Sequence, residues 1–338
     1  MDVIFIQLLN GLDKGAAYAL IALGLTLAFG TLGIVNFAHG VLFMLGAFCT
    51  VSVYKVLTIS EKVLDESITF FKAYKEIPYL ETWWGETGTM IIDYAVPISI
   101  IFAIPIMILV GIIMERGLIR HFYKRDHADQ ILVTFGLAIV IQEIVKHFYG
   151  ANPIPIGAPE IVSGSAAIGV FLGLGENLVY PWWRMIYFVF SVVVIGGVFS
   201  FLKYTTYGMV VRAGMWDREM VGMLGIDIQR RFTVVFALAA VVAGLAGVMY
   251  TPIVAPDYHM GMNFLVLSFV VVVVGGMGSL PGAVVAGFML GILESFSSMN
   301  EVKQILPGID QIIIYLVAVA ILLLRPRGLM GRKGVMED

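Results

Sequence analysis

The chain has 338 residues, of which 59% are hydrophobic and only 13% are charged, and its formal net charge is −3. Soluble proteins carry about 25% charged residues, so this composition excludes a soluble enzyme and a disordered chain. The slightly acidic balance leaves no basic face for nucleic acid. Continuous apolar runs also exclude an outer-membrane barrel, in which apolar residues alternate with polar ones. The composition predicts a polytopic α-helical membrane protein.

Nine apolar runs are long enough to predict membrane spans, since a helix needs about 20 apolar residues to cross a bilayer. They predict a single all-α transmembrane domain over residues 1–338, a helical bundle of about 8–10 spans. The predicted spans are 3–29, 40–57, 91–114, 130–148, 185–203, 232–250, 262–277, 281–298 and 308–324.

The distribution of basic residues predicts the orientation of these spans. Segments 115–129, 203–231 and 325–333 hold 13 of the 21 Lys and Arg residues, and Arg184 is the one arginine outside them. Lys and Arg are enriched in cytoplasmic segments. The sequence therefore predicts an external N-terminus and a cytoplasmic C-terminus.

Two long segments then lie on the external side. Residues 58–88 form a polar insertion with six acids that ends in Trp83 and Trp84, and residues 150–184 are rich in Gly and Pro. Trp favours the membrane–water interface, so both segments are interpreted as solvated loops with aromatic anchors. The alternative is a docking surface for an external partner.

Two glycine-rich turns interrupt the apolar sequence and predict two broken hairpins. Residues 30–40 and 275–282 contain neither Lys nor Arg, unlike the other predicted cytoplasmic segments. Irregular backbone within the membrane is tolerated where it is buried in protein or lines a watery cavity, and paired breaks in a transporter point to its pathway. The alternative, compatible with the first, is that glycine permits tight turns and close helix packing. The candidate pathway residues are Asn36, Phe37, His39, Gly40, Gly275, Gly276, Gly278 and Ser279.

His39 is a functional candidate because it lies in a long run without Asp, Glu, Lys or Arg. We favour a role in organising the turn, where Asn36 can share a hydrogen-bond network with it, over a proton relay. Other charged groups are expected to neutralise one another near the interface. These are the Asp13–Lys14 pair, Glu294, and the group Glu143, Lys146 and His147.

The sequence lacks the motifs of an enzyme. No Gly-Lys dipeptide is present for a P-loop, and there is no HExxH motif or clustered Cys/His pattern. The single cysteine, Cys49, lies in an apolar run and is expected to pack. We therefore expect no catalytic residue, metal or cofactor in this chain, and another chain must supply any ATP site.

The predicted cytoplasmic segment 203–231 is long, charged and amphipathic. It predicts a short helix at about 217–224, which Gly225 would cap. The segment is either an ordinary connecting loop or a lever that docks into a cytoplasmic motor.

At this segment the sequence resembles a known family. Similar segments occur throughout most of the chain, outside the 58–88 insertion: 33–40, 212–227, 236–250, 271–287 and 324–331. Together they resemble the permease subunits of branched-chain amino acid importers of the ATP-binding cassette (ABC) class, in particular the LivH-like subunit. The acidic residue that often follows the first motif in this family is Val41 here.

The resemblance implies a multi-pass permease of the bacterial inner membrane. Its partners would be a second, LivM-like permease, two cytoplasmic ATPase subunits that bind ATP and Mg²⁺, and a periplasmic substrate-binding protein. The two glycine-rich turns would flank the translocation path. The 203–231 segment would couple to an ATPase through Arg212, Asp217, Arg218, Glu219, Gly222, Leu224 and Gly225.

Three alternatives remain at this point. Related importers carry urea or short amides. A stand-alone secondary transporter or channel would use the broken hairpins, but it would need a coupling-ion site, and carboxylates within the spans are scarce. An intramembrane enzyme based on His39 lacks a visible nucleophile or metal partner.

Overall fold

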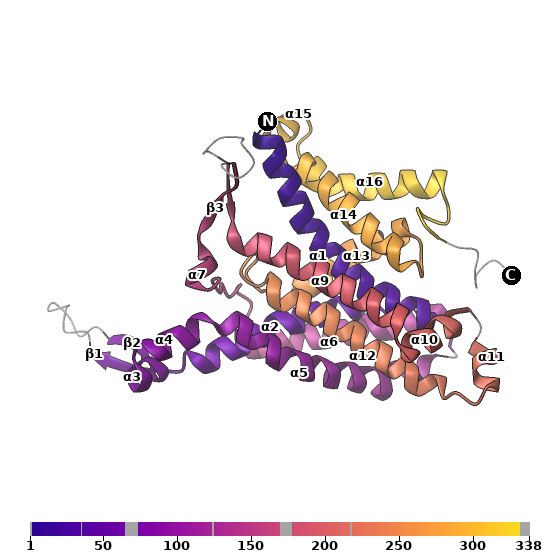
Figure 1. Cartoon of the computed structure of the whole chain (residues 1–338), viewed down its shortest axis with the longest axis horizontal. Helices are drawn as coiled ribbons and strands as arrows, with labels where there is room; N and C mark the ends of the chain where they lie inside the picture. Colours follow the sequence, from indigo (N-terminus) through magenta and orange to yellow (C-terminus); the bar gives the residue numbers. More distant parts are fainter. Residues whose placement is uncertain are drawn as a thin grey trace.

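The protein is an all-α bundle, seen in a computed structural model that describes residues 2–34, 36–64, 74–123, 125–169, 178–216 and 218–331 (Figure 1). The predicted fold class is confirmed. The long apolar helices are α1 (Asp2–Leu32), α2 (His39–Leu57), α5 (Ala95–Gly117), α6 (His127–Tyr149), α9 (Trp182–Tyr204), α12 (Ile228–Tyr250) and α14 (Leu280–Ser297). Two shorter apolar helices are α13 (Met260–Gly275) and α16 (Ile309–Leu324).

Each predicted span overlaps one of these nine helices. Within the described ranges, seven helices are long and apolar enough to cross a membrane. Helices α13 and α16 have 16 residues each. At 1.5 Å per residue they extend about 24 Å, less than the hydrocarbon thickness of about 30 Å. The short length of α13 results from its end at the second glycine-rich turn.

Short elements connect the long helices. Two antiparallel two-stranded sheets lie in the predicted external segments: β1 (Ser60–Leu64) with β2 (Tyr74–Pro78), and β3 (Ser165–Ala167) with β4 (Val179–Pro181). The short helices are α3 (Tyr79–Trp84), α4 (Glu86–Asp93), the 3-10 helix η1 (Ile119–Phe122), α7 (Glu160–Ser163), α10 (Thr206–Trp216), α11 (Arg218–Met223) and α15 (Asn300–Ile305).

The described part of the 58–88 segment is folded rather than a simple loop. Strands β1 and β2 pair in register from Ser60 with Pro78 to Leu64 with Tyr74, and the unit projects from one end of the bundle (Figure 1). Only Tyr94 separates helix α4 from α5. Its N–H donates to the Met90 carbonyl of α4 at 3.1 Å. The sequence did not predict this unit because its strands are short and charged.

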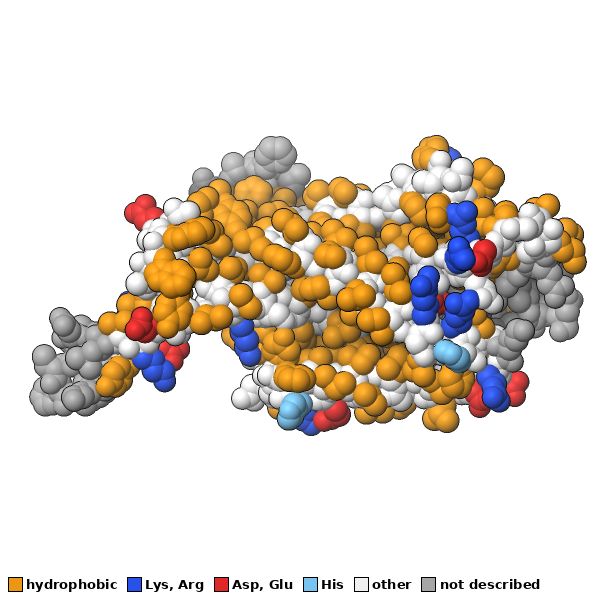
Figure 2. Space-filling view, turned by 90° about the horizontal axis from the view of Figure 1, so that it is seen from below, with side chains coloured by type: hydrophobic (Ala, Val, Ile, Leu, Met, Phe, Trp, Pro, Cys, Tyr) orange, Lys and Arg blue, Asp and Glu red, His pale blue; other side chains and the backbone are white. Residues whose placement is uncertain are grey.

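Helix α1 lies in the interior of the bundle. Its most apolar stretch is 83% buried and that of α12 is 78% buried, whereas those of α5, α6 and α9 are 22–28% buried. Helix α1 packs against α14, α12, α13 and α9. The outer helices present a broad hydrophobic surface, and Lys and Arg side chains gather towards one end of it (Figure 2). That surface suits contact with lipid.

Glycines allow α1 and α14 to pack backbone to backbone. Gly11 and Gly15 on α1 face Gly287 and Gly291 on α14, and each pair is spaced by four residues. A Cβ atom on Gly15 would lie 2.8 Å from the Cα atom of Phe288. Small residues at this spacing are the usual means of close helix association in lipid. The helices of the first predicted hairpin therefore have different main partners: α1 packs along α14, and α2 packs against α12 and α5.

The expected neutralisation of Asp13 by Lys14 is wrong. Lys14 Nζ pairs with Glu294 Oε1 on α14 at 2.9 Å, and Asp13 Oδ2 lies 3.6 Å from Arg184 Nη1 on α9. Adjacent helical residues do not face each other, so the two side chains reach different neighbours. By contrast, Lys146 pairs with Glu143 at 3.3 Å, as their i, i+3 spacing predicts.

We expect Gly15→Val to destabilise the chain by about 1–3 kcal/mol, the usual cost of overpacking a tight interface. Thermal unfolding of the purified chain in mild detergent measures the effect. Gly196→Val on α9 is the matched control, because a Cβ atom there meets nothing within 4 Å. Equal unfolding temperatures for the two variants would contradict the close α1–α14 contact.

Candidate translocation site

The first glycine-rich turn is organised by Asn36. Asn36 Oδ1 accepts a hydrogen bond from the Ala38 N–H at 2.9 Å, and its backbone carbonyl accepts from the His39 N–H at 3.2 Å. An Asn side chain commonly forms such a turn before a helix. Gly33, with φ of +65°, ends α1 in a conformation that favours glycine. The turn thus starts α2 at His39.

His39 is fully buried between α1 and α12. A Cβ atom on Gly24 would lie 2.7 Å from His39 Nε2 and 3.1 Å from the Ala239 carbonyl oxygen. Neither ring nitrogen makes a well-formed hydrogen bond to a described residue, and the Ile21 backbone of α1 is the polar group that the ring approaches. The expected network with Asn36 therefore involves the His39 backbone and not its ring, and the imidazole fills a space that Gly24 leaves open.

The second glycine-rich turn joins α13 to α14 in a tight reversal. Gly276 and Gly278 have φ values of +103° and +82°, which other residues rarely adopt. Ser279 Oγ accepts from the Gly282 N–H at 3.2 Å and caps α14. A side chain on Gly275 would collide with the backbone of Gly282. Close packing and the backbone conformation of the turn therefore explain why these positions are glycine.

The two turns lie together in the structure although about 240 residues separate them in the sequence. A Cβ atom on Gly278 would lie 3.9 Å from the Cα atom of Gly30. The Phe37 ring packs on Phe269 of α13 with centroids 5.6 Å apart. Gly40 lies against the backbone of α13, where a side chain would collide with the Gly261 carbonyl oxygen. All eight predicted pathway residues thus lie in or beside this pair of turns.

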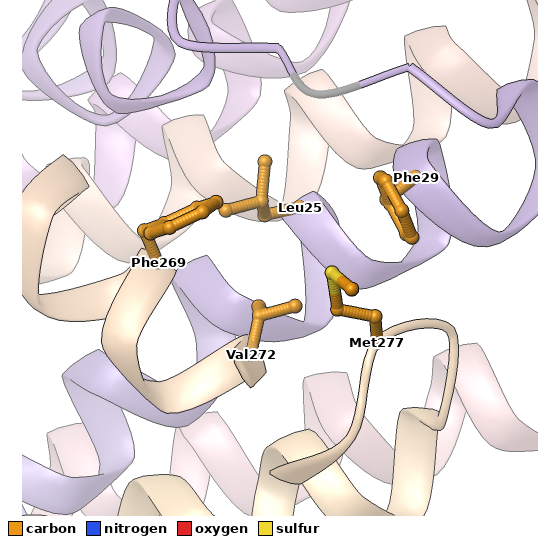
Figure 3. Close-up of a pocket in the computed structure, with 5 residues that line it drawn as sticks. All are labelled: Leu25, Phe29, Phe269, Val272 and Met277. Atoms are coloured by element: carbon orange, nitrogen blue, oxygen red, sulfur yellow. The ribbon is translucent and has the colours of Figure 1, made fainter. Parts of the chain in front are cut away.

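A small apolar pocket lies beside these turns. It is lined by Leu25 and Phe29 of α1, Phe269 and Val272 of α13, and Met277 of the second turn (Figure 3). Every lining side chain is apolar, so the pocket offers van der Waals contact without a charge. Sequence analysis predicted both turns but named none of the five lining residues. Met277 lies within the second turn, and nothing distinguishes the other four from the remaining apolar residues of their spans.

The segment 203–231, which the sequence predicts to be cytoplasmic, contains helices α10 and α11 where one helix was predicted. Helix α11 (Arg218–Met223) confirms the predicted helix, and Gly225 ends it with a φ of +76°. Helix α10, which includes the exposed Arg212, was not predicted. Asp217 lies outside the described residues, and Arg218 and Glu219 lie in the first turn of α11.

Helix α11 presents an unusual exposed apolar surface for a charged segment. Met220, Met223 and Leu224 are 57%, 77% and 73% exposed. Gly222 borders open space, since a Cβ atom there meets nothing within 4 Å. Exposed apolar side chains gathered in this way mark interaction surfaces.

Together these features define a class: a polytopic helical membrane protein whose two glycine-rich turns meet beside an apolar pocket. The sequence matches the family described as "Branched-chain amino acid transport system / permease component" over residues 7–322. The match covers most of the chain, so the chain belongs to this family of ABC importer permeases, and the resemblance found in the sequence is confirmed.

Several curated relatives match nearly the whole chain. It is 25% identical over 335 residues to the high-affinity branched-chain amino acid transport system permease protein LivH of Escherichia coli K12, covering 97% of this chain and 96% of that protein. The corresponding protein BraD of Pseudomonas aeruginosa is 28% identical with the same coverage. The ribose import permease protein RbsC of Haemophilus influenzae is 22% identical over 242 residues, covering 70% and 72%. No solved structure matches the chain.

We expect His39→Ala to leave a cavity between α1 and α12 and to destabilise the chain by on the order of 2 kcal/mol. Thermal unfolding measures this loss. The ratio of transport rates at about pH 6 and pH 8 is expected to stay as in the parent, because an imidazole that only fills space relays no proton. Unchanged stability together with an altered pH ratio would favour the proton relay instead.

Proposed function

We propose that this permease moves branched-chain amino acids inward, along a path flanked by the two glycine-rich turns. The observation that carries the proposal is the apolar pocket between Leu25, Phe269 and Met277, with Phe29 and Val272 completing it. Its lining side chains are all apolar, which suits contact with an aliphatic side chain once the two turns move apart. A pathway without a fixed charge also does not trap a zwitterion. The names of LivH and BraD support the same substrate class.

In the complete importer this chain would have four kinds of neighbour: a second permease, lipid, the ATPase subunits and a substrate-binding protein. A second, LivM-like permease would pack beside this chain in the bacterial inner membrane, surrounded by lipid. Two ATPase subunits would bind ATP and Mg²⁺ on the cytoplasmic side, because this chain has no P-loop. A periplasmic substrate-binding protein would deliver the amino acid to the external side.

The proposed orientation places the N-terminus outside and the C-terminus in the cytoplasm. The basic residues of α10, α12 and the segment after α16 support it, since Lys and Arg are enriched on the cytoplasmic side. In this orientation α11 faces the ATPase subunits, and the β1–β2 unit extends into the periplasm.

Helix α11 is proposed as the coupling helix, docked in a cleft of one ATPase subunit. The exposed Met220 and Met223, with Leu224 directly after the helix, provide the apolar contact, and Arg212, exposed on α10, provides a charge. Closure of the ATPase pair would move α11, and with it α10 and α12, on which it packs. This motion would rock the two permeases between inward-open and outward-open states.

The substrate is tested by purifying the full-length chain from its own host with its partner subunits and reconstituting the complex in vesicles with the binding protein. ATP-dependent uptake of leucine, isoleucine or valine is the expected result. Uptake of urea or a short amide, with no uptake of these amino acids, would overturn the substrate assignment. Purification of this chain alone, at native expression level, would point to a stand-alone transporter or channel.

We expect Gly222→Trp to abolish ATP-driven transport while the importer still assembles. A Trp at this open position disturbs no packing within the chain but blocks docking of α11. Uptake and co-purification of the ATPase subunits are measured together. Gly117→Trp, at another open glycine near a cytoplasmic helix end, is the control that should transport normally. Normal uptake by the Gly222 variant would contradict the assignment of α11.

We expect Val272→Trp to lower uptake about tenfold or more, because the large ring fills the pocket and costs the substrate its contact there. Val266→Trp is the matched control on the same helix, at a position 43% exposed on the outer surface. Uptake of labelled amino acid at equal membrane content measures both. If the two variants transport equally, the pocket does not lie on the path.

A further inference from the structure

The segment that follows α16 returns to the second glycine-rich turn. The Leu329 N–H donates to the Val274 carbonyl at 2.8 Å, and the Met330 N–H donates to the Gly275 carbonyl at 3.0 Å. Carbonyls in the last turn of a helix have no partner within that helix. Residues 328–331, named here the C-terminal clip, therefore complete the broken end of α13.

Glycines make this contact a close fit between two backbones. A Cβ atom on Gly328 would lie 2.6 Å from the Gly276 backbone nitrogen. Side chains on Gly276 and Gly331 would collide with the Gly331 backbone and the Arg327 carbonyl, respectively. Gly276 and Gly328 also have φ values of +103° and +77°. The clip and the turn thus interlock at positions that only glycine accommodates.

The interlocked turn carries one wall of the apolar pocket. Met277 follows Gly276 directly and lines the pocket beside Phe29 (Figure 3). The next residue, Gly278, lies beside Gly30 at the end of α1. Displacement of the clip would therefore shift Met277 and loosen the contact between the two turns.

We propose that the C-terminal clip is a positioning element of an inner gate, which is the turn 276–279 with Met277 in the lining of the pocket. The clip holds this turn against α1 and keeps Val272 buried, and its movement exposes Val272. The assignment of the pocket to the transport path rests on the proposed function. The clip gives the cytoplasmic surface a route to the pocket separate from α11, which packs on α10 and α12.

Accessibility of Val272 tests the proposal. This residue lines the pocket and is 3% exposed. Cys49→Ala and Val272→Cys give a full-length chain with one thiol, which carries an N-terminal tag so that the clip stays free. In inverted membrane vesicles from the native host, with the partner subunits present, a water-soluble maleimide reports how often the pocket opens.

Met330→Pro is the first clip variant, because proline lacks the N–H that donates to Gly275. Met330→Ala keeps that N–H and is the matched control. Gly331→Ala is an independent variant that forces the clip away from the Arg327 carbonyl, with Gly117→Ala at an open position as its control. We expect both clip variants to raise the labelling rate of Val272→Cys about tenfold and both controls to leave it unchanged.

Equal labelling rates in the clip variants and their controls would overturn the proposal. Faster labelling of clip variants and controls alike would also overturn it, because the effect would not depend on the clip. The assay needs neither substrate nor ATP, so its result is independent of the substrate assignment. If the parent complex labels as expected but transports no amino acid, the proposed function fails and the clip stands.

Discussion

The close contact of α1 with α14 is the interaction on which the rest of the structure depends. In lipid no hydrophobic driving force favours helix–helix over helix–lipid contact, so association relies on van der Waals packing and polar pairs. Gly15 and Gly291 provide van der Waals packing by bringing two backbones together. Lys14 and Glu294 provide a polar pair, with Nζ and Oε1 2.9 Å apart. This contact holds α1 in the interior, where its C-terminal end meets both glycine-rich turns.

The pocket follows from that placement. Because α14 begins at the second turn, fixing α14 along α1 also fixes the turn beside Gly30. The clip then joins the last carbonyls of α13 to the chain after α16. These contacts are made by backbone atoms, with glycine at the closest approaches, and leave little room for adjustment. A packed arrangement of this kind shifts between discrete states rather than deforming gradually, which suits a gate.

The apolar pocket and the exposed surface of α11 lie in different parts of the chain. The pocket side chains are apolar, and the charged residues Asp13 and Lys14 in the N-terminal half of α1 are paired with partners on other helices. The apolar surface of α11 is exposed at a distance in sequence from the pocket. A family whose named relatives include both amino acid and ribose permeases is consistent with a conserved scaffold that carries different substrates.

The sequence by itself determined the nine apolar helices, both glycine-rich turns, the helix at α11 and its glycine cap. These features depend on local hydrophobicity and on backbone conformations that only certain residues favour. Tertiary structure decided the partner of α1, the partners of Asp13 and Lys14, the five residues of the pocket and the clip. A membrane helix is apolar on its lipid-facing and buried sides alike, so its sequence does not reveal which side chains meet another helix.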